Sequence, residues 1–228
     1  MHDAGRKKQL AELALTLLVI GSVWGFLEMT LGGFLHAIHF PQKGAVMGGI
    51  AVSLMAFFTT ITGKPALVPL LGVIAALLKP FSAFIYGIPV LSPFIVNPSI
   101  AIMLEALAFS VVVITFKKAL GKSIPAKMSA GMLAGALGIS FYAAVASIFG
   151  LGMWATLDLA ATIQTALTNA LPVALAGGLM LAGGDYAGRV SMTTLYNLKK
   201  AYPKAYLTAL LTIAILSWTI PVYFGVGI

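Results

Sequence analysis

The sequence predicts an all-α integral membrane protein, and its composition, its hydropathy and the length of its apolar segments all indicate this class. Of the 228 residues, 60% are hydrophobic and only 9% are charged, whereas a soluble domain carries about 25% charged residues. The mean hydropathy is +1.03. The apolar segments are close to the length of about 20 residues that a membrane-spanning helix needs. We therefore expect a helical bundle of six transmembrane helices, arranged as three hairpins, plus a seventh C-terminal helix.

Seven apolar segments meet this length criterion, and each is predicted to form one span. They cover residues 10–36, 44–63, 66–87, 98–117, 128–150, 160–182 and 205–225. The first segment follows the basic stretch MHDAGRKKQL. It is longer than the apolar core of a signal peptide and has no small-residue cleavage site at its end, so we predict that it is a retained span.

The connections between the spans differ in composition. The loops HFPQKG, GIPVLSPFIVNPS and GLGMWATLD are rich in Pro, Gly and aromatic residues, which is typical of short ordered caps. Asp158, before the sixth span, is expected to cap that helix. Residues 183–204 mix basic residues with Tyr and Leu, which favours a cytoplasmic amphipathic connector. The chain then divides into a six-helix membrane domain at 1–182, this connector and a C-terminal transmembrane helix at 205–228.

Basic residues gather at one set of span ends, and this asymmetry predicts the orientation. They are Arg6, Lys7, Lys8, Lys64, Lys117, Lys118, Lys122, Lys127, Arg189, Lys199, Lys200 and Lys204. Lys43 is the one basic residue in a loop on the other side. We therefore predict a multi-pass protein of the cell (inner) membrane. The positive-inside rule places its N-terminus on the cytoplasmic side. The net charge of +8 indicates no nucleic-acid partner, because the basic residues flank the membrane spans.

A layer of polar residues is predicted in the outer half of the membrane. With 1.5 Å of rise per residue, Glu28, Lys79 and Glu105 fall at similar depth in three different spans. Tyr142 and Asn169 would add neutral hydrogen-bonding groups at about the same level. A further candidate contact is the tyrosine at the outer end of the third span, Tyr86. Charged groups at this depth cost several kcal/mol unless they are paired, so the layer needs an explanation.

Two interpretations of this layer remain open. In the first, Lys79 forms a buried salt bridge with Glu28 or Glu105 that fixes the packing of the helices. In the second, the layer lines an outward-facing cavity that binds a small polar solute. Two carboxylates against one ammonium leave about one negative charge, which a cationic group, a proton or a metal ion would balance. Pro80 favours the second interpretation, because proline often kinks a helix where a cavity opens.

The histidines raise a weaker hypothesis of a metal site. His36 and His39 are three residues apart, so on a helix both rings would face one side, above Glu28. The axial distance from Glu28 to His36 is roughly 12 Å, which is long for one site. The alternative is that both histidines cap the helix end before Pro41.

Other function classes are limited by what the sequence contains. It has no cysteine, which excludes disulfides and thiolate chemistry. We recognise no motif of an ATPase, a dehydrogenase or a zinc protease, and no cofactor is identified. Three alternatives stay open: an intramembrane enzyme or metal-binding subunit using Glu28, Glu105 and His36 with His39, a proton-driven secondary transporter, and a subunit of a larger membrane complex.

Residues 10–182 resemble a known family at the level of architecture. Six apolar helices in about 180 residues, with a polar layer in the outer half and loops after the first, third and fifth helices, are similar to the substrate-binding S components of energy-coupling factor transporters. The resemblance implies capture of a vitamin or related micronutrient, a transmembrane coupling subunit and two ATPases. That family presents an Ala-x-x-x-Ala contact on its first helix, for which the nearest equivalents here are Ala11 with Ala14 and Gly21 with Gly25. The seventh helix departs from the family pattern.

Overall fold

The computed structural model describes residues 2–120 and 123–226, and within these ranges the chain forms helices and no strand. Seven candidate membrane spans are found among the described residues. This confirms the polytopic, all-helical class that the composition predicts. The grouping into three hairpins plus one helix stays a prediction. Lys122, which was counted for the orientation, and residues 227–228 of the last predicted segment lie outside the described ranges.

The elements follow the predicted order of the spans. They are α1 (His2–Ala37), α2 (Lys43–Thr62), η1 (Pro65–Leu67), α3 (Val68–Leu78), η2 (Lys79–Phe81), α4 (Ser82–Tyr86), α5 (Pro93–Thr115), α6 (Lys117–Leu120), α7 (Ile124–Ile148), η3 (Gly152–Thr156), α8 (Leu159–Ala201) and α9 (Pro203–Val226). The third span, Pro65–Tyr86, therefore contains two 3₁₀ turns and two α-helices. The second 3₁₀ turn contains Pro80, where a break was expected.

Local signals explain several helix ends. Asp158 caps α8 as predicted, because its side chain accepts a hydrogen bond of 2.7 Å from the backbone N–H of Ala161. Ser123 caps α7 through a 3.3 Å bond from the N–H of Ala126. The helix α2 ends at Gly63, whose φ of 68° is a left-handed conformation that favours glycine.

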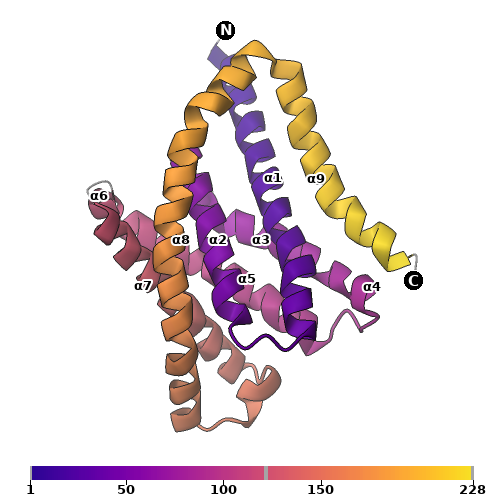
Figure 1. Ribbon diagram of the computed structural model, residues 1–228, viewed down its shortest axis with the longest axis vertical. Helices are drawn as coiled ribbons and strands as arrows, with labels where there is room; N and C mark the ends of the chain where they lie inside the picture. The colour runs from indigo at the N-terminus through magenta and orange to yellow at the C-terminus, as the bar shows by residue number, and fades with distance from the viewer. Residues whose placement is uncertain (1, 121–122, 227–228) are drawn as a thin grey trace.

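Helix α8 packs along both α2 and α7, and small residues let the backbones approach closely. The Cα of Gly131 in α7 faces the backbone of Gly177 in α8, where a Cβ on either residue would meet the carbonyl of the other. Gly184 of α8 lies against the backbone of Ser53 in α2 in the same way. These contacts are of the small-residue type that drives helix association in membranes. In Figure 1, α8 runs along nearly the whole height of the molecule.

The sixth span differs from its predicted length. We expected a helix over 160–182 and a separate connector over 183–204, but α8 continues without a break to Ala201. The reason lies in the packing at the expected boundary. Gly184 fits directly against α2, and Asp185 pairs with Arg189 one turn later, which supports the next turn. The helix ends before Pro203, which begins α9.

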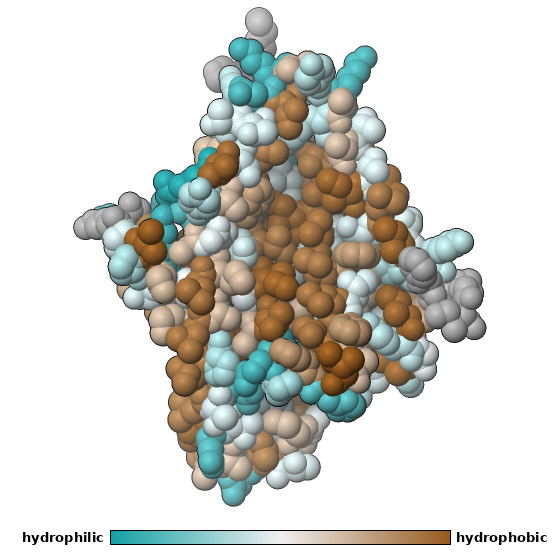
Figure 2. Space-filling model, in the orientation of Figure 1, coloured by the Kyte–Doolittle hydropathy of each residue, from teal (hydrophilic) through white to brown (hydrophobic). Residues whose placement is uncertain are grey.

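Helix α9 turns back and lies beside α1 and α4. Trp218 donates a 2.8 Å hydrogen bond from Nε1 to the hydroxyl of Ser22 in α1, and its ring packs edge-on against Phe81 at 5.8 Å. At the other end, Lys199 of α8 pairs with Glu12 of α1 at 2.5 Å. Figure 2 shows a mostly apolar surface over the middle of this face, with hydrophilic residues mainly toward its ends, as expected for a membrane-embedded bundle.

Candidate functional site

Lys79 and Glu28 lie close together inside the bundle. Both residues are buried, at 3% and 6% exposure. The ammonium of Lys79 donates a 2.8 Å hydrogen bond to the backbone carbonyl of Glu28. The carboxylate of Glu28 accepts a 3.3 Å hydrogen bond from Nε1 of Trp24. The ion pairs found among the described residues do not include Lys79, so the contact to Glu28 is through its carbonyl rather than a direct salt bridge.

The break at η2 explains how Lys79 reaches α1. The α-helical part of the third span ends at Leu78, and Lys79 opens a 3₁₀ turn that includes Pro80. The close packing of α1 on α3 also helps, since a Cβ at Gly25 would collide with Leu78 and with the carbonyl of Ala75. The backbone of α1 is therefore near enough for a lysine side chain to bind it.

An aromatic cluster adjoins the ammonium of Lys79. The ring centroid of Phe94 lies 5.6 Å from Nζ of Lys79, a cation–π distance. His36 packs edge-on against the same ring at 4.4 Å, and Tyr86 does so at 5.6 Å. The hydroxyl of Tyr86 donates to the carbonyl of Thr30 at 3.2 Å. The structure thus brings Lys79, Tyr86 and His36 together around Phe94, a residue that the sequence did not single out.

Glu105 lies on α5 between α2 and α7. An ideal Cβ at Gly138 would be 3.1 Å from its Cγ, and one at Gly48 would be 3.7 Å from its Oε1. The residue is partly exposed, and an electrostatic interaction couples it with Glu28. Among the residues that the structure describes, no hydrogen-bond donor or cation pairs with its carboxylate. A carboxylate of this kind is unusual within a membrane span.

Tyr142 and Asn169 make their contacts elsewhere. Tyr142 lies one helical turn beyond Gly138 and packs edge-on against Trp154 at 6.1 Å, below the cap formed by η3. Asn169 is exposed, and its amide donates to the carbonyl of Thr165 in its own helix at 2.8 Å. Among the described residues, no contact joins either side chain to Glu28, Lys79 or Glu105, so their part in one layer stays a prediction.

The two histidines do not share a helix face. The helix α1 ends at Ala37, and His39 lies in the following turn with φ of 54°. His36 is still on the helix and packs against Phe94. Within the described ranges there is no group of three or more His, Cys, Asp or Glu side chains that could hold a metal ion. The helical geometry on which the metal hypothesis depended is therefore not observed.

A second polar cluster, which the sequence did not single out, surrounds Asp185 of α8. One carboxylate oxygen accepts hydrogen bonds from Lys127 at 2.5 Å and from Arg189 at 2.9 Å, and the other accepts from Thr60 at 2.9 Å. The spacing of Asp185 and Arg189, four residues apart, was the one sequence signal for this cluster. This signal does not reveal the cluster by itself, because Thr60 and Lys127 come from distant parts of the sequence.

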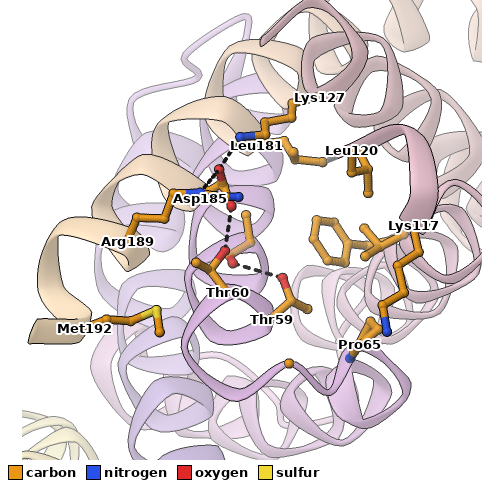
Figure 3. Close-up of a pocket in the computed structure, with 14 residues that line it drawn as sticks. Thr59, Thr60, Pro65, Lys117, Leu120, Lys127, Leu181, Asp185, Arg189 and Met192 are labelled. Carbon is orange, nitrogen blue, oxygen red and sulfur yellow. Dashed lines mark hydrogen bonds and ion pairs between the residues drawn. The ribbon is translucent and has the colours of Figure 1, made fainter. Parts of the chain in front are cut away.

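A cavity of about 320 Å³ adjoins this Asp185 cluster. Figure 3 shows Lys127 and Arg189 converging on Asp185 at one wall, with Lys117 and Pro65 at the opposite wall. Buried apolar side chains, including Phe109 and Leu181, complete the lining.

Comparison of the chain with family models, curated proteins and solved structures finds no match. Any functional argument therefore rests on the geometry of the residues themselves. That geometry offers two chemically distinct regions, the carboxyl groups of Glu28 and Glu105 with Lys79 nearby, and a cavity around Asp185 whose lining carries more cations than carboxylates.

Proposed function

We propose that this chain is a membrane transport protein that binds a small polar or cationic solute from outside the cell and mediates its uptake. The observation that carries this proposal is the carboxylate of Glu105, which lies inside the bundle with no counter-ion among the described residues. An ionised carboxyl group without a partner is costly to keep inside an apolar bundle. A cationic group on a solute would supply the missing charge.

The charge balance of the layer supports a cationic group. Glu28 and Glu105 are coupled electrostatically, and the nearby cation, Lys79, already donates to the backbone of α1. With all three groups ionised, two acids against one base leave a net charge of about −1. Glu105 is partly exposed, which gives a small molecule access to its carboxylate, while Gly138 and Gly48 leave room for the glutamate side chain itself between the helices.

The aromatic cluster suggests how the polar part of a solute would be oriented. The ring of Phe94 lies next to Lys79, and His36 and Tyr86 pack against this ring. The cluster therefore combines aromatic surface with the polar groups of a histidine and a tyrosine. Pockets for small molecules typically combine such apolar surfaces with few polar groups. In this proposal Lys79 and Tyr86 contact the polar part of the solute, Glu105 binds its cationic part, and Tyr142 and Asn169 contribute neutral contacts.

The proposed orientation follows the positive-inside rule, and the proposed partners follow the resemblance to the S components. In the cell membrane, the basic end of the bundle faces the cytoplasm, and the loops at the other end face the outside of the cell. Energy for uptake would come from a transmembrane coupling subunit and two ATPases. Uptake that persists in vesicles holding this chain alone, and that collapses with the proton gradient, would instead support a secondary transporter.

The proposal is tested by identifying what the protein retains. The chain is purified in detergent, and any small molecule that remains bound is identified by mass spectrometry. Glu105→Gln removes the charge and keeps the shape, so we expect the retained molecule to bind about 10- to 150-fold more weakly, from the roughly 1.5–3 kcal/mol of a charged hydrogen bond. Glu12→Gln, the same change at the basic end, should leave binding unchanged.

Two outcomes would count against this function. If Glu105→Gln folds with the melting temperature of the parent and still retains the molecule at full occupancy, Glu105 is not in the site. If the variant keeps its binding but stops converting the molecule to a product, the layer belongs to an intramembrane enzyme. Lys79→Ala is examined in parallel, with the melting temperature as the check on folding.

A further inference from the structure

The cavity beside Asp185 lies where four membrane spans end. Its lining includes Gly63 and Pro65, at the junction of the second and third spans, Lys117, just after the fourth, and Lys127, near the start of the fifth. These positions mark one boundary of the apolar bundle. The headgroups of membrane lipids are at this level in a bilayer.

The charges of the lining favour an anion. Lys117, Lys127 and Arg189 supply three cations, while Asp185 supplies the one carboxylate of the lining, which leaves an excess of about two positive charges. Lys127 and Arg189 offset the negative charge of Asp185 directly. Arg189 uses Nε for that contact, and its guanidinium carries further donors.

Of the three cations that line the cavity, Lys117 is the one that does not contact Asp185. It is exposed at the start of α6, and no described residue forms an ion pair with it. Figure 3 shows it across the cavity from the Asp185 cluster. An anion between the two walls would therefore be approached by cations from both sides.

The remaining lining and the volume restrict the kind of anion. Ala56, Phe109 and Leu181 are part of the buried core and form an apolar floor, so the cavity has a basic rim and an apolar interior. A volume of about 320 Å³ is at the lower end of the range for small-molecule pockets. It suits a headgroup or a small phosphate compound and not a complete lipid.

We propose that this cavity is a binding site for a phosphate group at the basic end of the bundle, supplied either by the headgroup of an anionic phospholipid or by a soluble phosphate. Lys117 and Arg189 bind the phosphate oxygens, and Asp185 holds Lys127 and Arg189 in place. The site is separate from the Glu105 layer, because Gly48, which faces Glu105, and Thr60 are 12 residues apart on α2, or about 18 Å.

The test uses a matched pair of lysines. Lys117→Glu reverses a charge that lines the cavity, while Lys118→Glu reverses the neighbouring charge, which is not part of the lining. Both changes leave the contacts of Asp185 intact. The purified proteins are mixed with micelles that contain equal amounts of phosphatidylglycerol and phosphatidylcholine, and bound lipids are counted by native mass spectrometry. A second arm compares potassium phosphate with potassium chloride, at equal ionic strength, by the shift in melting temperature.

Each outcome bears on the proposal. The site is assigned to a lipid headgroup if the protein prefers phosphatidylglycerol and this binding weakens about 30-fold in Lys117→Glu and much less in Lys118→Glu. The expected magnitude follows from roughly 1 kcal/mol for each of the two units of charge that the substitution changes. Stabilisation by phosphate that requires Lys117, without a preference for phosphatidylglycerol, assigns it to a soluble phosphate. Equal effects of the two lysine variants, or no preference for phosphatidylglycerol or phosphate, would overturn the proposal.

Discussion

Lys79 shows how a single cation is kept within an apolar bundle. Its ammonium binds a backbone carbonyl, lies over an aromatic ring and is attracted by a neighbouring carboxylate. Together these contacts offset part of the cost of removing the charge from water. From similar depths the sequence predicted one layer of Glu28, Lys79 and Glu105, and a pair of Lys79 with Glu28 or Glu105 was one of two interpretations of it. The sequence did not predict a contact to the carbonyl, since that depends on the 3₁₀ turn and the rotamer of Lys79.

Gly33 provides a prediction at this scale, because it makes room for the Tyr86 ring. A Cβ at this position would overlap the hydroxyl and the ring of Tyr86. We expect Gly33→Ala to displace Tyr86, to lower stability by about 1–3 kcal/mol and to weaken binding of the proposed solute. Thermal unfolding in detergent and the ligand measurement check both effects. Gly44→Ala, where a Cβ would have nothing within 4 Å, is the control, and an equal loss in both variants would contradict the interpretation.

Removing the hydroxyl of Tyr86 should have a smaller effect. Tyr86→Phe deletes the 3.2 Å hydrogen bond to Thr30 but keeps the ring against Phe94. A hydrogen bond of this kind contributes about 0.5–1.5 kcal/mol. We therefore expect a small decrease in melting temperature. A loss of solute binding in Tyr86→Phe beyond this stability change would assign the hydroxyl a direct contact with the solute.

Helix α8 is the element for which sequence and structure differ most. Composition marked 183–204 as different from the span before it, and the polar character of that segment is real. Whether a polar segment continues a helix depends on what it packs against. Here Gly184 packs against Ser53, and Asp185 accepts hydrogen bonds from Thr60 and Lys127. Such partners come from distant parts of the chain. The existence of the seven spans was predictable from length and hydropathy, while the end of this one was not.

The α7–α8 contact gives a prediction for two glycines. Gly131→Ala would place a Cβ against the backbone of Gly177, which cannot move aside as a flexible side chain does. We expect a loss of about 1–3 kcal/mol in stability. Gly183→Ala, on the same helix as Gly177, adds its Cβ to open space and should leave the stability unchanged or raise it by up to about 1 kcal/mol. Thermal unfolding of both variants decides, and a loss in Gly183→Ala as large as in Gly131→Ala would show that the contact does not limit stability.

At the scale of the whole molecule, charge is distributed unevenly along the bundle. The Glu105 layer has excess negative charge, and the Asp185 cavity at the basic end has excess positive charge. The helices α2 and α8 pass both regions and run in the same direction, since Gly48 lies near Val173 and Thr60 lies near Gly188. Hydropathy predicted the membrane spans of the bundle. The composition of the two regions depends on which helix faces pack against each other, and hydropathy along the sequence does not contain this information.

The orientation can be measured directly because the chain has no cysteine. We expect Gln42→Cys, in the loop after α1, to react with a membrane-impermeant maleimide on intact cells. Lys118→Cys, at the basic end, should react only after the cells are permeabilised. The unmodified chain is the control for background labelling. The reverse pattern would place the basic end outside and would contradict the proposed direction of uptake.

The hydrogen bond between Trp218 and Ser22 joins residues 196 positions apart, so the first helix of the chain is completed by the last. During synthesis at about 5–20 residues per second, roughly 10–40 seconds pass between the appearance of the two residues. Throughout that interval the hydroxyl of Ser22 lacks its partner from α9. The packing of this side of α1 is therefore completed late in synthesis.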